Sequence, residues 1–421
     1  MNNVLLISYY FPPMGGAGTQ RSVGFVKYLP KNGWDPYVLT VKNDKYYFHD
    51  NNLLNAISSN VKIFRTHYFE PRHIYRRDFT KKQRSEKKNM LSSILIKIVK
   101  FIFFIDDLMF WIPFAYFRGL KIIKKNSISI IYSSSPPETS HIVAYLLNKR
   151  TNIPWVADFR DEWTNDPYRI FPTKFHKKIA AFLEKMVIKN AKKVISAAEH
   201  ITNYLASLLK NSEKQKFFTI TNGFDYELVI FKNKPIRTKK FIITHTGSFS
   251  KSEGPKYFFK AINNLLSQNT IPLNKIEIKF YGAISNIQHI SFPAIIEYLP
   301  YVSYQKLSSI LRQSTILLLI ISSIRGEAAY TTKIFDYIAS SVPILALLPP
   351  TGLASKLIKQ TNTGYIVESE NIEDISNAIL NLYKKWQKDK LIIKPNYNLI
   401  SQFSRKELTK KLATIFNQIK K

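Results

Sequence analysis

The sequence contains no cysteine. Disulfide bonds and thiolate metal sites are therefore excluded, and the composition suits a reducing cytoplasm. Acidic residues are also scarce: 29 Asp and Glu stand against 62 Lys and Arg, and the formal net charge is +33. Such a charge favours a polyanionic partner, namely nucleic acid, an anionic membrane or a phosphorylated substrate. Stacking motifs and zinc-finger spacings are missing, so we expect no nucleic-acid partner.

Long uncharged apolar runs are missing as well, and none approaches the ~20 residues of a membrane-spanning helix. The most apolar segment, residues 91–125, is interrupted by charged side chains. We expect one or two helices there, broken near Pro113, with part of their surface either in the core or in a membrane interface. The basic cluster RRDFTKKQRSEKK, residues 76–88, precedes this segment. Such a cluster can hold a protein peripherally on the anionic inner face of the cytoplasmic membrane; a core helix pair beside a solvated loop is the alternative.

What the sequence does contain is a regular alternation of short apolar runs and amphipathic patterns. Runs such as VLLISYY, ISIIYSS and WVADF predict buried strands, and KFHKKIAAFLEKMVIKN and PKYFFKAINNLL predict helices. Buried strands joined by helices are typical of parallel, doubly wound sheets. Since 421 residues exceed one ordinary core, we expect two Rossmann-like α/β domains that face each other across a cleft.

The predicted domain boundaries follow the composition. The first domain spans residues 1–231 and carries the hydrophobic and basic insertion at about 70–125. The polar stretch KNKPIRTKK, residues 232–240, is the expected linker. The second domain spans residues 241–395.

A glycine-rich turn follows the first predicted strand in SYYFPPMGGAGTQR. Gly15 and Gly16 then lie at the carboxyl edge of the sheet, where open α/β folds bind ligands. Glycine lets backbone N–H groups approach an anion, and Arg21 falls in the first turn of the next helix. The stretch matches neither the dinucleotide fingerprint nor the loop of nucleoside triphosphatases. A plain tight turn is the alternative.

Two polar clusters follow later strands of the first half. SSSPPETSH places His141 in the first turn of a helix, where the dipole favours the neutral imidazole. VADFRDEW places Asp158, Arg160 and Asp161 after a strand, with Trp163 beside them. These groups can pair with one another. They can equally offer acceptors to sugar hydroxyls while Trp163 stacks on a ring face.

The predicted linker is flanked by two further strand ends. Asn222, in TITNGFD, ends a strand just before the linker. After it, HTGSFSKSEG places Gly247, Ser248 and Lys251 behind the strand FIITH.

The stretch TTKIFDYIASSVPILAL predicts a helix between two buried strands. Thr331 or Thr332 is the candidate N-cap, Lys333 lies in the first turn, and Asp336 follows three residues later on the same side. A cation beside free N–H groups suits a diphosphate, and a carboxylate one turn along suits the paired hydroxyls of a ribose. The pattern predicts a nucleotide site.

Across nearly the whole chain, and in the same order, these motifs resemble those of the family 4 glycosyltransferases, which are retaining enzymes of the GT-B fold. The matching segments are SYYFPPMGGAGTQR, SSSPPETSH, VADFRDEW, TITNGFD, HTGS and TTKIFDYIASSVPILAL. The members that it resembles most build bacterial surface polysaccharides such as capsule and lipopolysaccharide.

The resemblance implies a role for each motif. Donor-binding residues would be Gly15, Gly16, Gly247, Ser248, Lys251, Thr332, Lys333 and Asp336. Acceptor-side residues would be Arg21, His141, Trp163 and Asn222. Catalytic residues would be His141, Asp158, Arg160, Asp161 and Lys333. The last residues, 396–421, look like the terminal helix that returns to the first domain in this fold.

The chain departs from the family pattern at two places. The family often has two glutamates eight positions apart, whereas here the second is Asp336 and the first position is Ala328, with Glu327 offset by one. The donor loop offers lysines only, where the family usually has an arginine and a lysine. We expect altered donor contacts, and reduced activity is a possible consequence.

The sequence has no Asp-x-Asp cation site, so we expect metal-independent transfer without a cofactor. Lys333, Lys251 and the helix N-terminus would then stabilise the departing diphosphate. The expected partners are a nucleotide-sugar donor, a glycan or lipid-linked glycan acceptor, and an anionic membrane surface. Two alternatives stay open: a non-hydrolysing nucleotide-sugar 2-epimerase of the same architecture, and a basic membrane-binding module without enzymatic activity.

Overall fold

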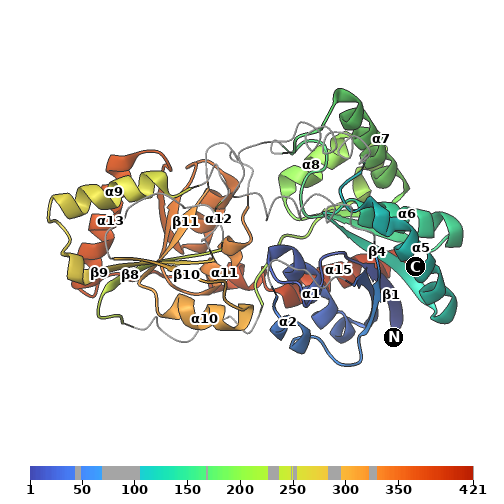
Figure 1. The fold of residues 1–421 in the computed structure, drawn as a ribbon, viewed down its shortest axis with the longest axis horizontal. Helices are drawn as coiled ribbons and strands as arrows, with labels where there is room; N and C mark the ends of the chain where they lie inside the picture. The colour runs from blue at the N-terminus through green and yellow to red at the C-terminus, as the bar shows by residue number, and fades with distance from the viewer. Residues whose placement is uncertain are drawn as a thin grey trace, which may run out of the picture. The chain divides into compact units, whose positions relative to one another are not determined.

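The computed structural model describes residues 1–42, 49–68, 105–166, 169–225, 237–247, 249, 254–282, 295–321 and 330–420. These residues form two compact units. The first unit comprises residues 1–221 and 409–421, and the second comprises residues 222–408. Each unit contains one parallel β-sheet with helices packed on it (Figure 1). The basic cluster at 76–88 and most of the predicted linker lie outside the described residues, so the domain boundaries stay predictions.

The sheet of the first unit has seven parallel strands in the order β3-β2-β1-β4-β5-β6-β7. The strands are β1 (Asn2–Ile7), β2 (Trp34–Val41), β3 (Lys62–Thr66), β4 (Ile128–Ser135), β5 (Trp155–Phe159), β6 (Lys193–Ser196) and β7 (Phe217–Thr219). Successive strands are added on one side of β1 as far as β3, and from β4 onward they are added on its other side. This pair of strands is therefore the switch point, outside whose carboxyl ends open sheets bind ligands.

Helices cover both faces of this sheet. They are α1 (Ala17–Tyr28), α2 (Asn52–Asn55), α5 (Ile112–Lys125), α6 (Thr139–Thr151), α7 (Lys174–Asn190) and α8 (Glu199–Ser207). The connections from β3 through β7 all progress in one direction, and right-handed crossovers place α5, α6 and α7 on the same face. The last helix, α15 (Arg405–Lys420), brings Phe416 edge-on to Trp34, with ring centroids 5.1 Å apart.

The second unit has six parallel strands in the order β10-β9-β8-β11-β12-β13. The strands are β8 (Phe241–Thr246), β9 (Ile276–Tyr281), β10 (Ile296–Leu299), β11 (Ile316–Ile320), β12 (Ile344–Leu347) and β13 (Gly364–Val367). The helices are α9 (Lys256–Ser267), α10 (Tyr304–Arg312), α11 (Lys333–Ala339), α12 (Leu353–Thr361), α13 (Ile372–Gln387) and α14 (Tyr397–Ser401). Its core joins Phe258 and Phe259 of α9 to Phe280 of β9 and Ile379 of α13. The switch point lies between β8 and β11.

The prediction of two parallel, doubly wound α/β sheets is confirmed. Pro113 needs a correction, because it lies in the first turn of α5 and does not break a helix. A proline tolerates this position since its missing N–H would have no partner there. In the described part of the chain, no helix combines the length and apolarity needed to cross a bilayer.

Candidate functional site

The predicted motifs of the first unit meet at the carboxyl ends of β1, β4 and β5. Arg160, just after β5, donates from Nε to the carbonyl oxygen of Ser135 at 2.9 Å. Its other nitrogens donate to the carbonyl oxygens of Gly18 and Pro136. The glycine turn and the loop before α6 are thus held to one guanidinium. These contacts give Arg160 a positioning role. The catalytic role expected for it stays a prediction.

Asp158 and Arg21 form a buried ion pair. Nε and Nη2 of Arg21 lie 2.9 and 2.7 Å from the two carboxylate oxygens of Asp158, and Tyr132 and Ser134 also donate to it. Burial alone would raise the pKa of Asp158, but the Arg21 charge and these hydrogen bonds hold that pKa below its usual value. The protein's own donors occupy the carboxylate. The ion pair gives Arg21 and Asp158 a joint structural role. The catalytic role expected for Asp158 and the acceptor contact expected for Arg21 stay predictions.

A hydrogen-bond relay fixes the tautomer of His141. Trp155 Nε1–H donates to Ser133 Oγ at 2.8 Å, and Ser133 Oγ lies 2.7 Å from His141 Nδ1. The hydroxyl proton of Ser133 has no other acceptor among the described residues, so it points to Nδ1 and leaves the imidazole proton on Nε2. Burial lowers the pKa of His141 to about 3. This direction agrees with the predicted neutral imidazole, and its main cause is burial.

His141 is fully buried, and its Nε2 has no hydrogen-bond partner among the described residues. An unsatisfied buried N–H costs ~1–3 kcal/mol, so it calls for an explanation. A ligand oxygen would remove the penalty, but it reaches this buried Nε2 only after the residues that cover the imidazole move. We keep His141 as a predicted ligand contact, and Ser133 and Trp155 are the positioning residues that sequence reasoning missed.

The other residues predicted around the acceptor lie in different environments. Trp163 is fully buried, so its ring cannot stack on a sugar, and that expectation is wrong. Asp161 is exposed beside Arg160. Gly16 has φ of 96°, a conformation that favours glycine, and directly precedes α1. Asn222 is the first residue of the second unit.

A second cluster, which sequence reasoning missed, holds the amino end of α6. Asp106 accepts hydrogen bonds from the backbone N–H and the hydroxyl of Thr139 at 2.7 and 2.6 Å. Beside it, Glu138 pairs with Arg169 at 2.5 Å. Asp106 lies 33 residues before its partner. It caps the helix that carries His141 from a distant segment, which no local capping pattern could reveal.

Glu138 should make stability depend on pH. Burial raises the pKa of Glu138 to about 7, with Arg169 opposing and Asp106 adding to the rise. The folded state then binds more protons than the unfolded state between about pH 4.5 and pH 7, so this group's contribution falls as pH rises through that window. We expect Glu138→Gln to reduce the change in the free energy of unfolding across this pH window by up to about 3 kcal/mol. Urea unfolding between pH 4.5 and 8 measures that change. If the free energy of unfolding varied equally with pH in both proteins, the prediction would be contradicted.

In the second unit, the switch point brings Gly247 and Lys333 together. Gly247 follows β8 with φ of 86°, and a Cβ built on it would lie 2.8 Å from Lys333 Cε. Lys333 Nζ lies 3.1 Å from Nε2 of His245, whose Nδ1 lies 2.9 Å from the carbonyl oxygen of Leu318. Because that carbonyl can only accept, His245 carries its proton on Nδ1 and offers the Nε2 lone pair to the ammonium.

His245 is the first residue of the motif HTGS and positions Lys333, a role that the sequence did not predict. Burial and then the Lys333 charge hold the pKa of His245 well below its usual value, so the ring stays neutral. The ring also stacks on Phe249 with centroids 4.0 Å apart, and Lys333 Nζ lies 5.7 Å from the Phe249 centroid. The lysine ammonium is therefore oriented at the carboxyl edge, as a diphosphate site requires.

Asp336 lies in a different environment from Lys333. Its carboxylate accepts a hydrogen bond from Tyr304 at 2.7 Å, and the Arg405 guanidinium lies 4.9 Å from the centroid of the Tyr304 ring. Burial raises the pKa of Asp336 to about 6, although Arg405 and the bond from Tyr304 oppose the rise. The two side chains contact different partners, and their shared role in one nucleotide site stays a prediction. The ribose contact of Asp336 stays a prediction.

Of the remaining residues predicted to bind the donor, only some lie in the described part of the chain. Thr332 occupies the N-cap position of α11, yet its side chain makes no capping hydrogen bond. Ser248, Lys251 and the pair Glu327 and Ala328 lie outside the described residues. Within the described residues, no group of three or more His, Cys, Asp or Glu is arranged to hold a metal ion.

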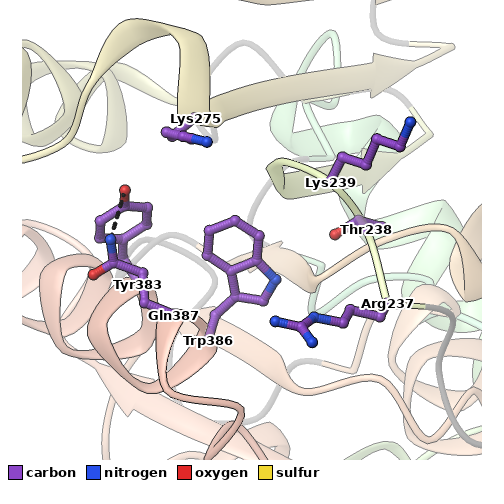
Figure 2. Close-up of a pocket in the computed structure, with 7 residues that line it drawn as sticks. All are labelled: Arg237, Thr238, Lys239, Lys275, Tyr383, Trp386 and Gln387. Atoms are coloured by element: carbon purple, nitrogen blue, oxygen red, sulfur yellow. Dashed lines mark hydrogen bonds between the residues drawn. The ribbon is translucent and has the colours of Figure 1, made fainter.

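A pocket of about 420 Å³ lies at the opposite edge of the second sheet. Its lining residues precede β8 and β9 or end α13: Arg237, Thr238, Lys239, Lys275, Tyr383, Trp386 and Gln387. Figure 2 shows the Trp386 ring between Tyr383 and Arg237. Since Gly247 and Lys333 lie at the carboxyl ends of the strands, this pocket is no part of the predicted donor site.

Comparison with known proteins identifies the class. Residues 228–398 match the family model described as "Glycosyl transferases group 1", and this segment contains β8, Gly247 and α11. No curated protein matches the chain. The matched segment and the two-sheet fold define a glycosyltransferase with the GT-B architecture.

Solved structures share this fold at low sequence identity. Sucrose-phosphate synthase from Thermosynechococcus elongatus is 13% identical with a TM-score of 0.67, covering 100% of this chain and 99% of that one. Anabaena Alr3699/HepE, in complex with UDP-glucose, is 12% identical with a TM-score of 0.64 and 99% coverage of both chains. A variant of TarM from S. aureus, in complex with fondaparinux, alpha-GlcNAc-glycerol and UDP, is 11% identical with a TM-score of 0.60, covering 99% and 100%.

Proposed function

We propose that this glycosyltransferase moves a sugar from a nucleotide-sugar donor to a glycan or lipid-linked glycan acceptor, with retention of configuration and without a metal ion. The observation that carries the proposal is the arrangement of Lys333, His245 and Gly247 in the second unit. A neutral imidazole orients an ammonium against a glycine backbone at the edge where open sheets bind ligands. Neighbours of the same fold hold UDP-glucose or UDP, which supports a nucleotide-sugar donor.

The proposed chemistry is a front-face displacement. The bond between the anomeric carbon and the diphosphate oxygen breaks, and an acceptor hydroxyl oxygen bonds to that carbon on the same face. The hydroxyl proton passes to a phosphate oxygen of the departing nucleoside diphosphate. Negative charge grows on the diphosphate as it leaves, so a preorganised ammonium such as that of Lys333 lowers the barrier. No side chain with the features of a covalent nucleophile emerged from the motifs.

We assign the acceptor to the carboxyl edge of the first unit. His141 offers a buried N–H there, while Arg160 holds the surrounding loops. A role in surface polysaccharide assembly, as a member of family 4 working peripherally on the inner face of the cytoplasmic membrane, follows from the resemblance of the motifs and is part of the proposal. The transferred sugar and nucleobase are left to experiment.

A screen of uridine, guanosine and adenosine diphosphate sugars tests the proposal. One donor should raise the melting temperature, because a ligand that binds the folded state stabilises it by mass action. With that donor and acceptor glycans isolated from membranes, we expect release of nucleoside diphosphate that persists in EDTA, and a product with unchanged anomeric configuration by NMR. Conversion of the sugar without any acceptor would instead show an epimerase. Binding that collapses with salt and ignores the nucleotide would show a basic binding module.

A further inference from the structure

The outer surface of α5, α6 and α7 differs from the rest of the described protein. α6 packs against both α5 and α7, and Figure 1 shows α6 between them in the first unit. The inner side of this layer is buried by residues such as Ala115 and Ile122 of α5 and Val143 of α6. Exposed side chains lie on the outer side, and their composition bears on what this face can bind.

Exposed aromatic rings gather on this layer. Phe114 and Phe117 of α5 are 44% and 63% exposed, and Phe175 and Phe182 of α7 are 57% and 68% exposed. Among the phenylalanines in the described part of the chain, these four alone are exposed. Single exposed apolar residues are ordinary, but a concentration of the largest ones on neighbouring helices marks an interaction surface.

The same layer is strongly basic. Eleven residues of the three helices are Lys or Arg: four on α5, two on α6 and five on α7. Only one residue of these helices is acidic, Glu184, and it is fully buried. The exposed surface of the layer therefore carries basic side chains with no carboxylate between them. The excess of basic residues over the whole chain does not by itself require such a concentration of positive charge on one face.

Position along the helices separates the two kinds of side chain on α5. Phe114 and Phe117 lie in its first half, and Lys121, Lys124 and Lys125 are exposed in its second half. Apolar rings and long basic side chains on one solvent-facing side are the features of interfacial helices, whose rings enter the headgroup region while the ammonium groups meet anionic lipid. A nucleic-acid duplex, whose bases stay stacked on one another, would satisfy the charges but not the rings. An apolar protein surface would satisfy the rings but not the charges.

We propose that the outer face of α5, α6 and α7 docks on an anionic lipid bilayer. The inference deepens the proposed function, since it states which surface of the enzyme meets the membrane that holds a lipid-linked acceptor. It does not use Lys333 or His245, so lipid binding and donor binding can be measured independently. The basic cluster at residues 76–88 is not needed for it.

Flotation with phosphatidylcholine vesicles, with and without 30 mol% phosphatidylglycerol, tests this surface. We expect the full chain to float with the anionic vesicles and at least ten-fold less with the neutral ones. Lys121→Glu with Lys125→Glu should reduce binding at least ten-fold, and Phe114→Ser with Phe117→Ser should do so even at low salt. All these positions are exposed, so melting temperatures should stay unchanged.

The matched control is Lys356→Glu with Lys359→Glu on α12, which changes the net charge equally at two exposed positions of the second unit. The control should keep at least half of the wild-type binding. Equal losses in both charge variants would overturn the proposal in favour of unspecific attraction. Self-association without lipid that the Phe variants abolish would overturn it in favour of a dimer interface.

Thermal shifts with the nucleotide-sugar donors, measured on the same variants, separate this proposal from the proposed function. Lipid binding by a protein that responds to no donor would contradict the proposed function and leave the lipid-binding surface standing.

Discussion

Lys333→Ala should lower the rate of sugar transfer by about 10²–10³-fold, the loss typical when one preorganised group that stabilises transition-state charge is removed. Lys333 Nζ is held by the neutral ring of His245 at 3.1 Å and lies against Gly247. The alanine variant loses the charge at the point where the departing diphosphate becomes most negative. We expect the loss mainly in kcat, because the charge on the diphosphate grows along the reaction. Initial rates of nucleoside diphosphate release measure it.

Two further variants separate chemistry from charge alone. Lys333→Arg keeps the charge but changes the shape of the donor group, so activity should fall less than in the alanine variant. Lys356→Ala removes an exposed lysine of the same unit and should leave the rate within two-fold of wild type. Should Lys333→Ala match Lys356→Ala, the diphosphate assignment would be lost.

Arg21→Ala should destabilise the first unit by about 3–5 kcal/mol, the cost of leaving one partner of a buried ion pair without the other. The side chains of Arg21 and Asp158 are 3% and 0% exposed, so water cannot replace the missing guanidinium. In the native protein the pKa of Asp158 is lower than in the unfolded chain. The ionised carboxylate therefore stabilises the fold at pH values above the ordinary pKa of an aspartate, and this stability is lost as pH falls through the pKa of the folded state. In the variant the sign reverses, because an unpaired buried carboxyl has a raised pKa.

The deficit of Arg21→Ala should therefore be smaller at pH 5 than at pH 8, since the orphaned carboxyl can then take up a proton. Urea unfolding at both pH values, followed by tryptophan fluorescence, measures the difference. Arg150→Ala on α6 removes an exposed arginine of the same unit and should cost less than about 0.5 kcal/mol. A deficit in Arg21→Ala as small as that control, or one that grows toward acid pH, would contradict the buried-pair interpretation.

The fold followed from patterns that are local in the sequence. KFHKKIAAFLEKMVIKN corresponds to α7, and the buried apolar runs correspond to the central strands, because covering both faces of a sheet demands continuous apolar residues. Two strands were missed, β3 and β13. Both lie at sheet edges and both are largely half-exposed, so their residues lack the continuous apolar signal of the interior strands.

The candidate site was predictable only where it follows strand ends. Gly247 and Lys333 could be paired because the loops after parallel strands share one edge. The contacts that orient the site were not predictable. Arg21 meets Asp158 across 137 positions, and His245 meets Lys333 across 88. Such partners come from tertiary packing, and no local spacing encodes them. The prediction that Trp163 stacks on a sugar failed for the same reason. Polar neighbours in the sequence do not reveal that a side chain is buried by tertiary packing.

A crystal structure with the preferred nucleoside diphosphate tests the central claim most directly. We predict that a diphosphate oxygen lies within about 2.7–3.2 Å of Lys333 Nζ, beside the backbone of Gly247, with His245 still bonded to the lysine. A diphosphate bound instead in the pocket beside Trp386 at the other edge of the sheet, with Lys333 facing solvent, would contradict it.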